Sequence, residues 1–156
     1  MEKRPDLEGT QNLEQLLERA IVWADEQSRD ALEAGTPLTE QEFELARTVG
    51  VEHPEFVRIV EVDAIPVPAD SELKVKATET GLFGPNIAGI TFNYAIYIKK
   101  GQRTDSLVSH ELRHVYQYEQ AGSIRNFLLI YIPQLFSVGY TNAPLELDAQ
   151  AHEKRL

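Results

Sequence analysis

The chain has 156 residues, 42% of them apolar, and its formal net charge is -10. This length and composition predict one domain (1–156) with a single hydrophobic core, and the negative charge disfavours binding to nucleic acid or to an anionic membrane. The sequence contains no cysteine, so disulfides and thiolate ligands are excluded, and a transition metal would have to be held by His, Asp or Glu.

Two segments bear on where the protein resides. Residues 1–15 lack the apolar stretch of a signal peptide. The most apolar run, residues 127–132, is far shorter than the roughly 20 residues that a membrane-spanning helix needs. We therefore expect a soluble, cytoplasmic protein with no membrane partner.

The N-terminal third has the pattern of two helices. Apolar residues recur at helical spacing from about residue 10 to 34, and a turn with glycine and proline follows. Thr39 and Glu42 have the form of a capping box before a second helix that runs to about Val49. We expect residues 1–50 to be a helical segment that supports the fold. The alternative is that these acidic helices dock a partner or act as a self-inhibiting cover over a site.

The middle of the chain has three candidate strands. Residues 56–63 are rich in β-branched side chains, and residues 73–77 alternate between apolar and polar positions. Residues 90–98 alternate most clearly and form the best predicted strand, whereas residues 81–86 read as a loop. Helices first, then a small mixed sheet, then more helices predict an α+β fold.

Three helices are predicted in the C-terminal half. Thr104 or Asp105 can cap a helix that runs to about Gln120. The next segment is very apolar and is interrupted by Pro133, so we expect it to form the buried centre of this half. A last helix should span about residues 143–154.

The sequence His-Glu-Leu-Arg-His places His110 and His114 four residues apart. On a helix this spacing puts the two imidazoles about 40° apart around the axis, so both can bind one metal ion. Glu111 lies beside them, and Val108 and Leu112 fall on the opposite side, where the helix must pack on a core. The motif therefore has the context that a metal site requires. The alternative is a pair of surface histidines on a solvated helix.

A catalytic zinc ion usually takes three protein ligands, so the two histidines need a partner. Glu146 in the first turn of the last predicted helix can fold back over them. Asp148 and Glu153 are rival ligands, and an acidic residue in a first helical turn can also be explained by the helix dipole.

These residues resemble the zincins, the metallopeptidases built on this helix motif, and specifically the minimal single-domain type of the gluzincin branch. The resemblance is strongest over about residues 88–153, and it implies a zincin-like catalytic core over 56–156. In that family the third ligand is a glutamate on a later helix, which implies a Zn²⁺ ion bound by His110, His114 and Glu146. The predicted strand at 90–98 resembles the edge strand that pairs with an extended peptide.

The resemblance implies a zinc-dependent endopeptidase that acts on a peptide or protein substrate. Glu111 would be the general base for a zinc-activated water, and Tyr140 is the first candidate donor to the oxyanion, with Tyr116 and His152 as rivals. Gln150 stands where gluzincins often place an acidic residue that supports a ligand histidine. The alternative hypothesis is therefore a non-catalytic zinc-binding structural or interaction module.

Overall fold

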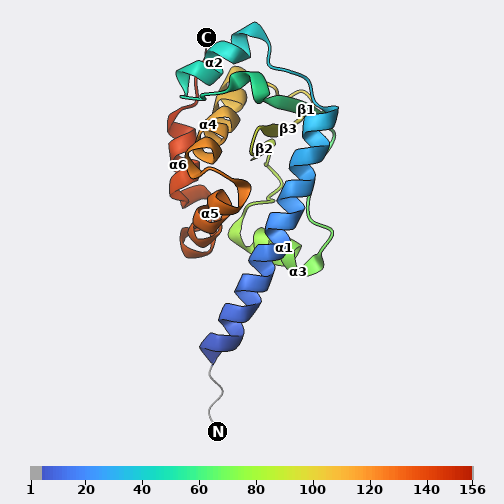
Figure 1. Ribbon diagram of the computed structural model, residues 1–156, viewed down its shortest axis with the longest axis vertical. Coiled ribbons are helices and arrows are strands. Elements are labelled where there is room, and N and C mark those ends of the chain that lie inside the picture. Colours follow the sequence, from blue (N-terminus) through green and yellow to red (C-terminus); the bar gives the residue numbers. More distant parts are fainter. Residues whose placement is uncertain (1–4, 156) are drawn as a thin grey trace.

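The computed structural model describes residues 5–155, with the backbone alone for residues 5–11. Over this range the chain forms six α-helices, three strands and two short 3-10 helices, which confirms the α+β class (Figure 1). In chain order the elements are α1 (Pro5–Ala34), α2 (Glu40–Thr48), η1 (Pro54–Phe56), β1 (Arg58–Val62), α3 (Ser71–Thr80), β2 (Gly89–Phe92), β3 (Ala95–Lys99), α4 (Asp105–Ala121), α5 (Ile124–Val138), η2 (Tyr140–Asn142) and α6 (Pro144–Ala151).

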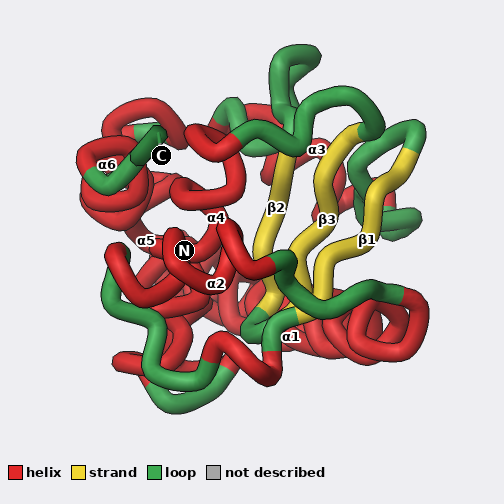
Figure 2. The backbone as a smooth tube through the Cα atoms, turned by 90° about the horizontal axis from the view of Figure 1, so that it is seen from above, coloured by secondary structure: helices red, strands yellow, loops and turns green. Residues whose placement is uncertain are grey.

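The three strands form one mixed sheet in the order β1–β3–β2. β1 runs parallel to β3, with Ile59 opposite Ile96, and β2 runs antiparallel to β3, with Ile90 opposite Tyr97. Figure 2 shows the strands side by side, with β2 on the side where α4, α5 and α6 gather. β2 is therefore the edge strand next to the helix that carries the two histidines.

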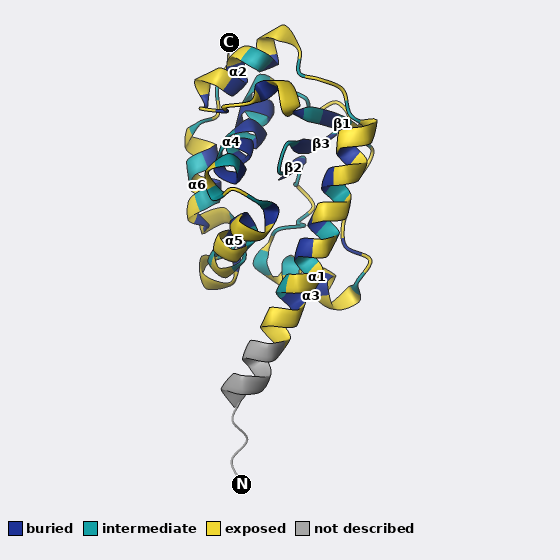
Figure 3. Ribbon diagram, in the orientation of Figure 1, coloured by how far each residue is buried: buried dark blue, intermediate teal, exposed yellow. Residues whose placement is uncertain are grey.

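The sheet separates two clusters of buried apolar side chains. Ile96 and Ile98 of β3 belong to a cluster with Leu112 of α4, which also takes in side chains of α2. The alternate residues of β3, Ala95 and Tyr97, belong to a cluster formed with α1 and α5. α1 thus covers one face of the sheet, and α2 with α4 covers the other. The dark blue residues of α4 and β3 in Figure 3 mark this buried centre.

The single strand predicted over residues 90–98 is wrong, because residues 93–94 form a tight turn between β2 and β3. Asn93 has a φ of 60°, in the left-handed region that asparagine tolerates better than most residues. A two-residue turn changes which alternate residues share a face, so Phe92 packs in the same cluster as Ala95. Of the two strands that this segment forms, β2 lies at an edge of the sheet and β3 is central.

The strand predicted over residues 73–77 is also wrong, because this segment belongs to helix α3. The Asp70 side chain accepts hydrogen bonds from the backbone N–H groups of Glu72 and Leu73 at the N-terminus of the helix. Gly81 ends the helix in a left-handed conformation, with a φ of 91°. Both ends are thus capped, and these local interactions outweigh the alternating pattern.

α5 is one continuous helix, not an interrupted and buried one. Leu129, Ile130 and Phe136 are 46%, 51% and 44% exposed, whereas Tyr131 faces the core. Pro133 is also exposed, so water can satisfy the carbonyl group that the missing N–H leaves free. Only one side of this apolar helix is buried.

The other predicted helices are confirmed. Thr39 and Glu42 form the capping box of α2, and Thr104 caps α4 by accepting from the N–H of Leu107. α6 is shorter than predicted, since it ends at Ala151. Among residues 5–155, no helix is long and apolar enough to cross a lipid bilayer.

Candidate metal centre

α4 positions His110 and His114 because its opposite face is fixed to the sheet. Val108 and Leu112 are almost fully buried in the cluster with α2 and β3, which turns the histidines toward α6. The centroids of the two imidazole rings lie 5.0 Å apart. His114 is buried and His110 is partly buried, so neither is a surface histidine on a solvated helix face.

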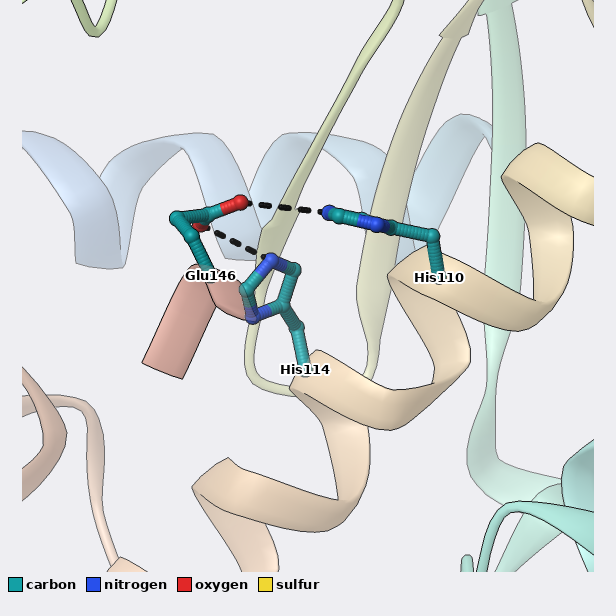
Figure 4. A group of neighbouring side chains, drawn as sticks. All are labelled: His110, His114 and Glu146. Carbon is teal, nitrogen blue, oxygen red and sulfur yellow. Dashed lines mark hydrogen bonds and ion pairs between the residues drawn. The ribbon is translucent and has the colours of Figure 1, made fainter. Parts of the chain in front are cut away.

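α6 supplies the third side chain. Glu146 lies in its first turn, is buried, and reaches between the two imidazoles (Figure 4). Its Oε1 lies 3.2 Å from Nε2 of His110, and its Oε2 lies 3.0 Å from Nε2 of His114. Among the described side chains, this is the group of three whose potential ligand atoms all lie within 4.8 Å of one another.

The three side chains fit a small divalent cation. Ligands of tetrahedral zinc bind at about 2.0–2.2 Å and are therefore separated by roughly 3.3 Å. Here one ligand atom from each residue lies within 4.8 Å of the others, and Nε2 of each histidine lies 3.0 to 3.2 Å from one oxygen of Glu146. Two imidazoles and one carboxylate suit zinc and also cobalt or nickel.

The ring orientation of His114 is set from its other nitrogen. Nδ1 of His114 lies 2.8 Å from Oε1 of Gln117. The Nε2 of Gln117 donates to the Leu145 carbonyl and to Asp148, both at 2.9 Å, so Oε1 is the acceptor. Nδ1 of His114 therefore carries the hydrogen, and Nε2 is the atom left for a metal. A partner of this kind fixes the tautomer of a ligating histidine.

The two rival ligands surround the centre without joining it. Asp148 forms an ion pair with Arg113, at 2.8 Å, and accepts from Gln117. Glu153 lies 3.1 Å from Nδ1 of His110, on the side of the ring away from Glu146. Both carboxylates thus support the histidines from outside.

Burial and charge set the protonation of the three central groups. Burial alone would lower the pKa of His114, but the charge and hydrogen bond of Glu146 raise it to about 9. Burial and the charge of His114 would lower the pKa of His110, but Glu146 and the charge of Glu111 together raise it. Burial would raise the pKa of Glu146, yet both histidines hold it well below its ordinary value. A protonated His114 beside an ionised Glu146 thus places positive charge where a cation would bind.

Glu111 lies next to the centre and against the edge strand. Its side chain is 3% exposed, and Oγ1 of Thr91 donates a hydrogen bond to its Oε1 at 2.8 Å. A Cβ at Gly89 would lie 3.1 Å from Oε2 of Glu111, a tight contact that would require this side chain or β2 to shift. Burial raises the pKa of Glu111, and the two nearby histidines oppose the shift. A carboxylate with a raised pKa is a better proton acceptor near neutral pH.

Two tyrosines, Tyr131 and Tyr140, lie near Glu146, and Tyr131 was not among the site residues predicted from the sequence. The Tyr131 hydroxyl donates to Oε2 of Glu146 at 2.7 Å. A tyrosine in an apolar run is a signal for a buried polar contact, but its partner depends on how α5 crosses α6. Burial raises the pKa of Tyr140, and the charges of Glu146 and Glu111 raise it further, so this hydroxyl stays protonated and can donate.

The rival donors lie in other surroundings. Tyr116 packs under the guanidinium of Arg113, whose central carbon is 3.9 Å from the ring centroid. Nδ1 of His152 bonds to the carbonyl oxygen of Asp148 at 2.7 Å. Neither residue lines the groove or the pocket that adjoins Glu111.

Two cavities of different character meet at Glu111. An open groove of about 380 Å³ lies between the loop before β2 and the side chains of His110, Tyr140 and Glu153. An almost wholly apolar pocket of about 140 Å³ lies on the other side and is bounded by α1, α3 and α5. Gly89, Glu111 and Tyr140 line both.

Comparison with protein-family models, with curated proteins and with solved structures found no match. The class of this protein therefore follows from its own fold and site. It is an α+β protein in which two histidines of α4 and a glutamate of α6 form a candidate metal centre, beside a buried glutamate and an edge strand.

Proposed function

We propose that this protein is a zinc-dependent hydrolase that cleaves peptide bonds. The observation that carries the proposal is the convergence of His110, His114 and Glu146 on one point, with Glu111 between this point and the edge strand. The arrangement supports the resemblance to gluzincins that the sequence suggested. It would give the ion three protein ligands and leave a fourth position for water or substrate.

A bound Zn²⁺ would supply a Lewis acid that polarises the substrate carbonyl and makes water more acidic. Glu111 accepts a proton as the water oxygen bonds to the carbonyl carbon. The carbon–nitrogen bond then breaks, and the nitrogen takes this proton and leaves as an amine, so the products are a carboxylate and an amine. The Tyr140 hydroxyl donates to the carbonyl oxygen as negative charge develops on it.

The edge strand favours a peptide as the substrate. The open groove runs past residues 88–89 at the start of β2, next to Glu111. An extended peptide can add to such an edge through backbone hydrogen bonds. β2 has only four residues, and the Thr91 carbonyl already accepts a hydrogen bond from Tyr118. Backbone pairing should therefore involve only one or two substrate residues next to the cleaved bond.

The test is cleavage of a peptide library by the zinc-loaded protein, read by mass spectrometry. Glu111→Gln should retain zinc and lose at least about 100-fold in rate, the usual contribution of general base catalysis. Glu119→Gln is the matched control, because it makes the same change on α4 at a residue that binds the N–H groups of Glu52 and His53 instead. Unchanged cleavage by Glu111→Gln, or cleavage that survives a chelator, would contradict the proposal.

One observation favours a second function, a metal site that only joins helices. α6 has eight residues, too few for a helix to be stable by itself, and Glu146 is one of its two buried side chains. An ion shared with His110 and His114 would tie α6 to α4. If zinc raises the melting temperature but no peptide in the library is cleaved, this non-catalytic role is the correct one.

A further inference from the structure

The apolar pocket beside the candidate metal centre has no role in the chemistry described above. Glu111, His114 and Glu146 are among its lining residues. Other lining residues come from α1, α3 and α5, and the sequence resemblance to gluzincins does not extend to α1. The pocket therefore joins the N-terminal helix to the centre.

The lining of this pocket limits what can occupy it. α1 contributes Leu16, Leu17, Ala20 and Trp23, and nearly all of the accessible lining is apolar. A peptide backbone placed there would leave its N–H and C=O groups without partners, at a cost of several kcal/mol per group. An apolar side chain has no such penalty.

The size of the pocket narrows the choice further. Its volume of about 140 Å³ is close to that of an apolar cavity of about 150 Å³ that binds benzene. One large apolar side chain, of the size of phenylalanine or leucine, matches this volume.

We propose that α1 forms the wall of a substrate pocket, which binds one large apolar side chain of the peptide next to the cleaved bond. The inference rests on the proposed function of the metal centre. The open groove and the apolar pocket share Gly89 and Glu111, so a peptide backbone in the groove can direct a side chain into the pocket. This assigns α1 a part in substrate binding, in place of the self-inhibiting cover considered from the sequence.

The position of α1 agrees with a permanent wall. Ala24 and Ala31 are buried in the cluster with the sheet and α5, at 2% and 1% exposure. Figure 1 shows α1 running along the sheet and past α3. Its side chains thus bound the pocket while the helix itself is part of the core.

Trp23 gives a direct signal for occupation of the pocket. It is the only tryptophan in the sequence. The centroid of its ring lies 5.3 Å from that of Phe92, and both residues line the pocket. The probes are two capped peptides that differ at one position, acetyl-Ala-Ala-X-Ala-Ala-amide, with X either 4-nitrophenylalanine, which quenches tryptophan fluorescence, or alanine. The titrations use the full chain, with zinc and without it.

We expect the nitrophenyl peptide to quench Trp23 saturably and the alanine peptide to have no effect. Ala20→Phe fills the pocket from α1 and should weaken the quenching peptide at least about tenfold, as steric changes of this size do in apolar pockets. Ala34→Phe is the control, because it makes the same change at an exposed residue of α1. Ala77→Phe fills the pocket from α3 and replaces Ala20→Phe if that variant does not fold.

The outcomes separate the pocket from the chemistry. Quenching that Ala20→Phe or Ala77→Phe weakens supports the pocket, even if no peptide is hydrolysed and the proposed function fails. The inference is overturned if the two peptides behave alike, or if Ala34→Phe weakens binding as much as the filling variants. It is also overturned, in favour of a lipid ligand, if dodecanoate quenches Trp23 while the nitrophenyl peptide does not.

Discussion

His114 and Gln117, which lie about one turn apart on α4, are joined by a 2.8 Å hydrogen bond from Nδ1 to Oε1. Gln117 is itself fixed by α6, because it donates to the Leu145 carbonyl and to Asp148. The helix that supplies Glu146 therefore also orients one of the histidines. The geometry of the centre depends on how α4 packs against α6.

Replacing Gln117 should weaken metal binding more than it weakens the fold. In Gln117→Ala, His114 loses the acceptor that holds its ring, and loss of such a partner typically costs about 10 to 100-fold in affinity. Competition with a chelator of known affinity measures the change. Gln120→Ala, at an exposed position of the same helix, is the control and should bind zinc like the wild type. Equal affinities for all three proteins would show that Gln117 has no orienting role.

Gly89→Ala should impair hydrolysis while zinc binding persists. The added Cβ would lie 3.1 to 3.2 Å from the carboxylate of Glu111, so this side chain or β2 must shift. A small displacement of a catalytic group can cost up to about 100-fold, and we expect a loss of at least about tenfold in kcat. Gly101→Ala, where the new Cβ would meet nothing within 4 Å and which lines neither cavity, should leave kcat within about twofold of wild type, although its left-handed backbone can cost some stability. A normal kcat in Gly89→Ala would argue against Glu111 as the base.

Metal binding should release protons. In the metal-free protein the pKa of His114 is raised to about 9, so this residue is protonated at neutral pH and must lose a proton to bind an ion. Zinc affinity should therefore increase as pH rises toward 9. Calorimetry in buffers of different ionisation enthalpy counts the protons, and a heat of binding independent of the buffer would contradict this prediction.

The raised pKa of His114 also makes the stability of the metal-free protein depend on pH. Because the folded pKa of His114 lies above the ordinary value of 6.5, its interaction with Glu146 is fully stabilising below pH 6.5. That contribution is lost as pH rises through about 9. In acid the interaction is lost again, since Glu146 has a lowered pKa and stabilises the fold above its ordinary pKa of 4.5. Chemical denaturation of wild type and His114→Gln at several pH values should show the largest difference between about 4.5 and 6.5.

Glu42 of α2 forms a largely buried ion pair with Arg103 that should stabilise the fold. This side chain accepts two hydrogen bonds of 2.7 Å from Arg103 and also caps the N–H of Thr39. Loss of charged hydrogen bonds of this kind costs about 1.5–3 kcal/mol, so Glu42→Gln should lower the free energy of unfolding at pH 7 by about 2 kcal/mol. Glu44→Gln, which removes an exposed pair with Arg47, should cost less than about 0.5 kcal/mol.

The sign of the pH dependence at Glu42 is opposite to that of His114. Burial would raise the pKa of Glu42, but contacts with Arg103 and Thr39 lower it, so its contribution is present above the ordinary value of 4.5. It is lost as pH falls through the lowered folded value. Denaturation below pH 4.5 should therefore bring wild type and Glu42→Gln together, and a constant difference would contradict the assignment.

The sequence predicted the parts of the site that depend on local interactions. Thr104 caps α4, and the four-residue spacing of His110 and His114 sets their shared face before any tertiary contact forms. Glu146 could be inferred because a first-turn carboxylate after a helix and a turn can fold back. The structure brings its oxygens to within 3.2 Å of both rings.

What the sequence could not predict depends on how elements cross. Thr91 contacts Glu111 because β2 ends at the turn that begins at residue 93 and lies along α4. This turn contains no glycine, which is the usual sequence signal of a tight hairpin turn. The contacts of Tyr131 and Gln117 with α6 likewise depend on how α5 and α4 pack against that helix. Gln150, at the position where gluzincins often place an acidic residue, is exposed, and Gln117 of α4 supports His114 instead.

The most direct test of the central claim is the zinc content and affinity of the wild-type protein beside Glu146→Gln, purified without nickel-affinity steps. Glu119→Gln is the control, because Glu119 lies on α4 with the two histidines but binds the N–H groups of Glu52 and His53, away from the centre. We predict about one zinc ion per wild-type chain, similar binding by Glu119→Gln, and affinity reduced more than about 100-fold in Glu146→Gln. No zinc in the reconstituted wild type, or equal binding by Glu146→Gln, would mean that His110, His114 and Glu146 are an ordinary buried ion pair.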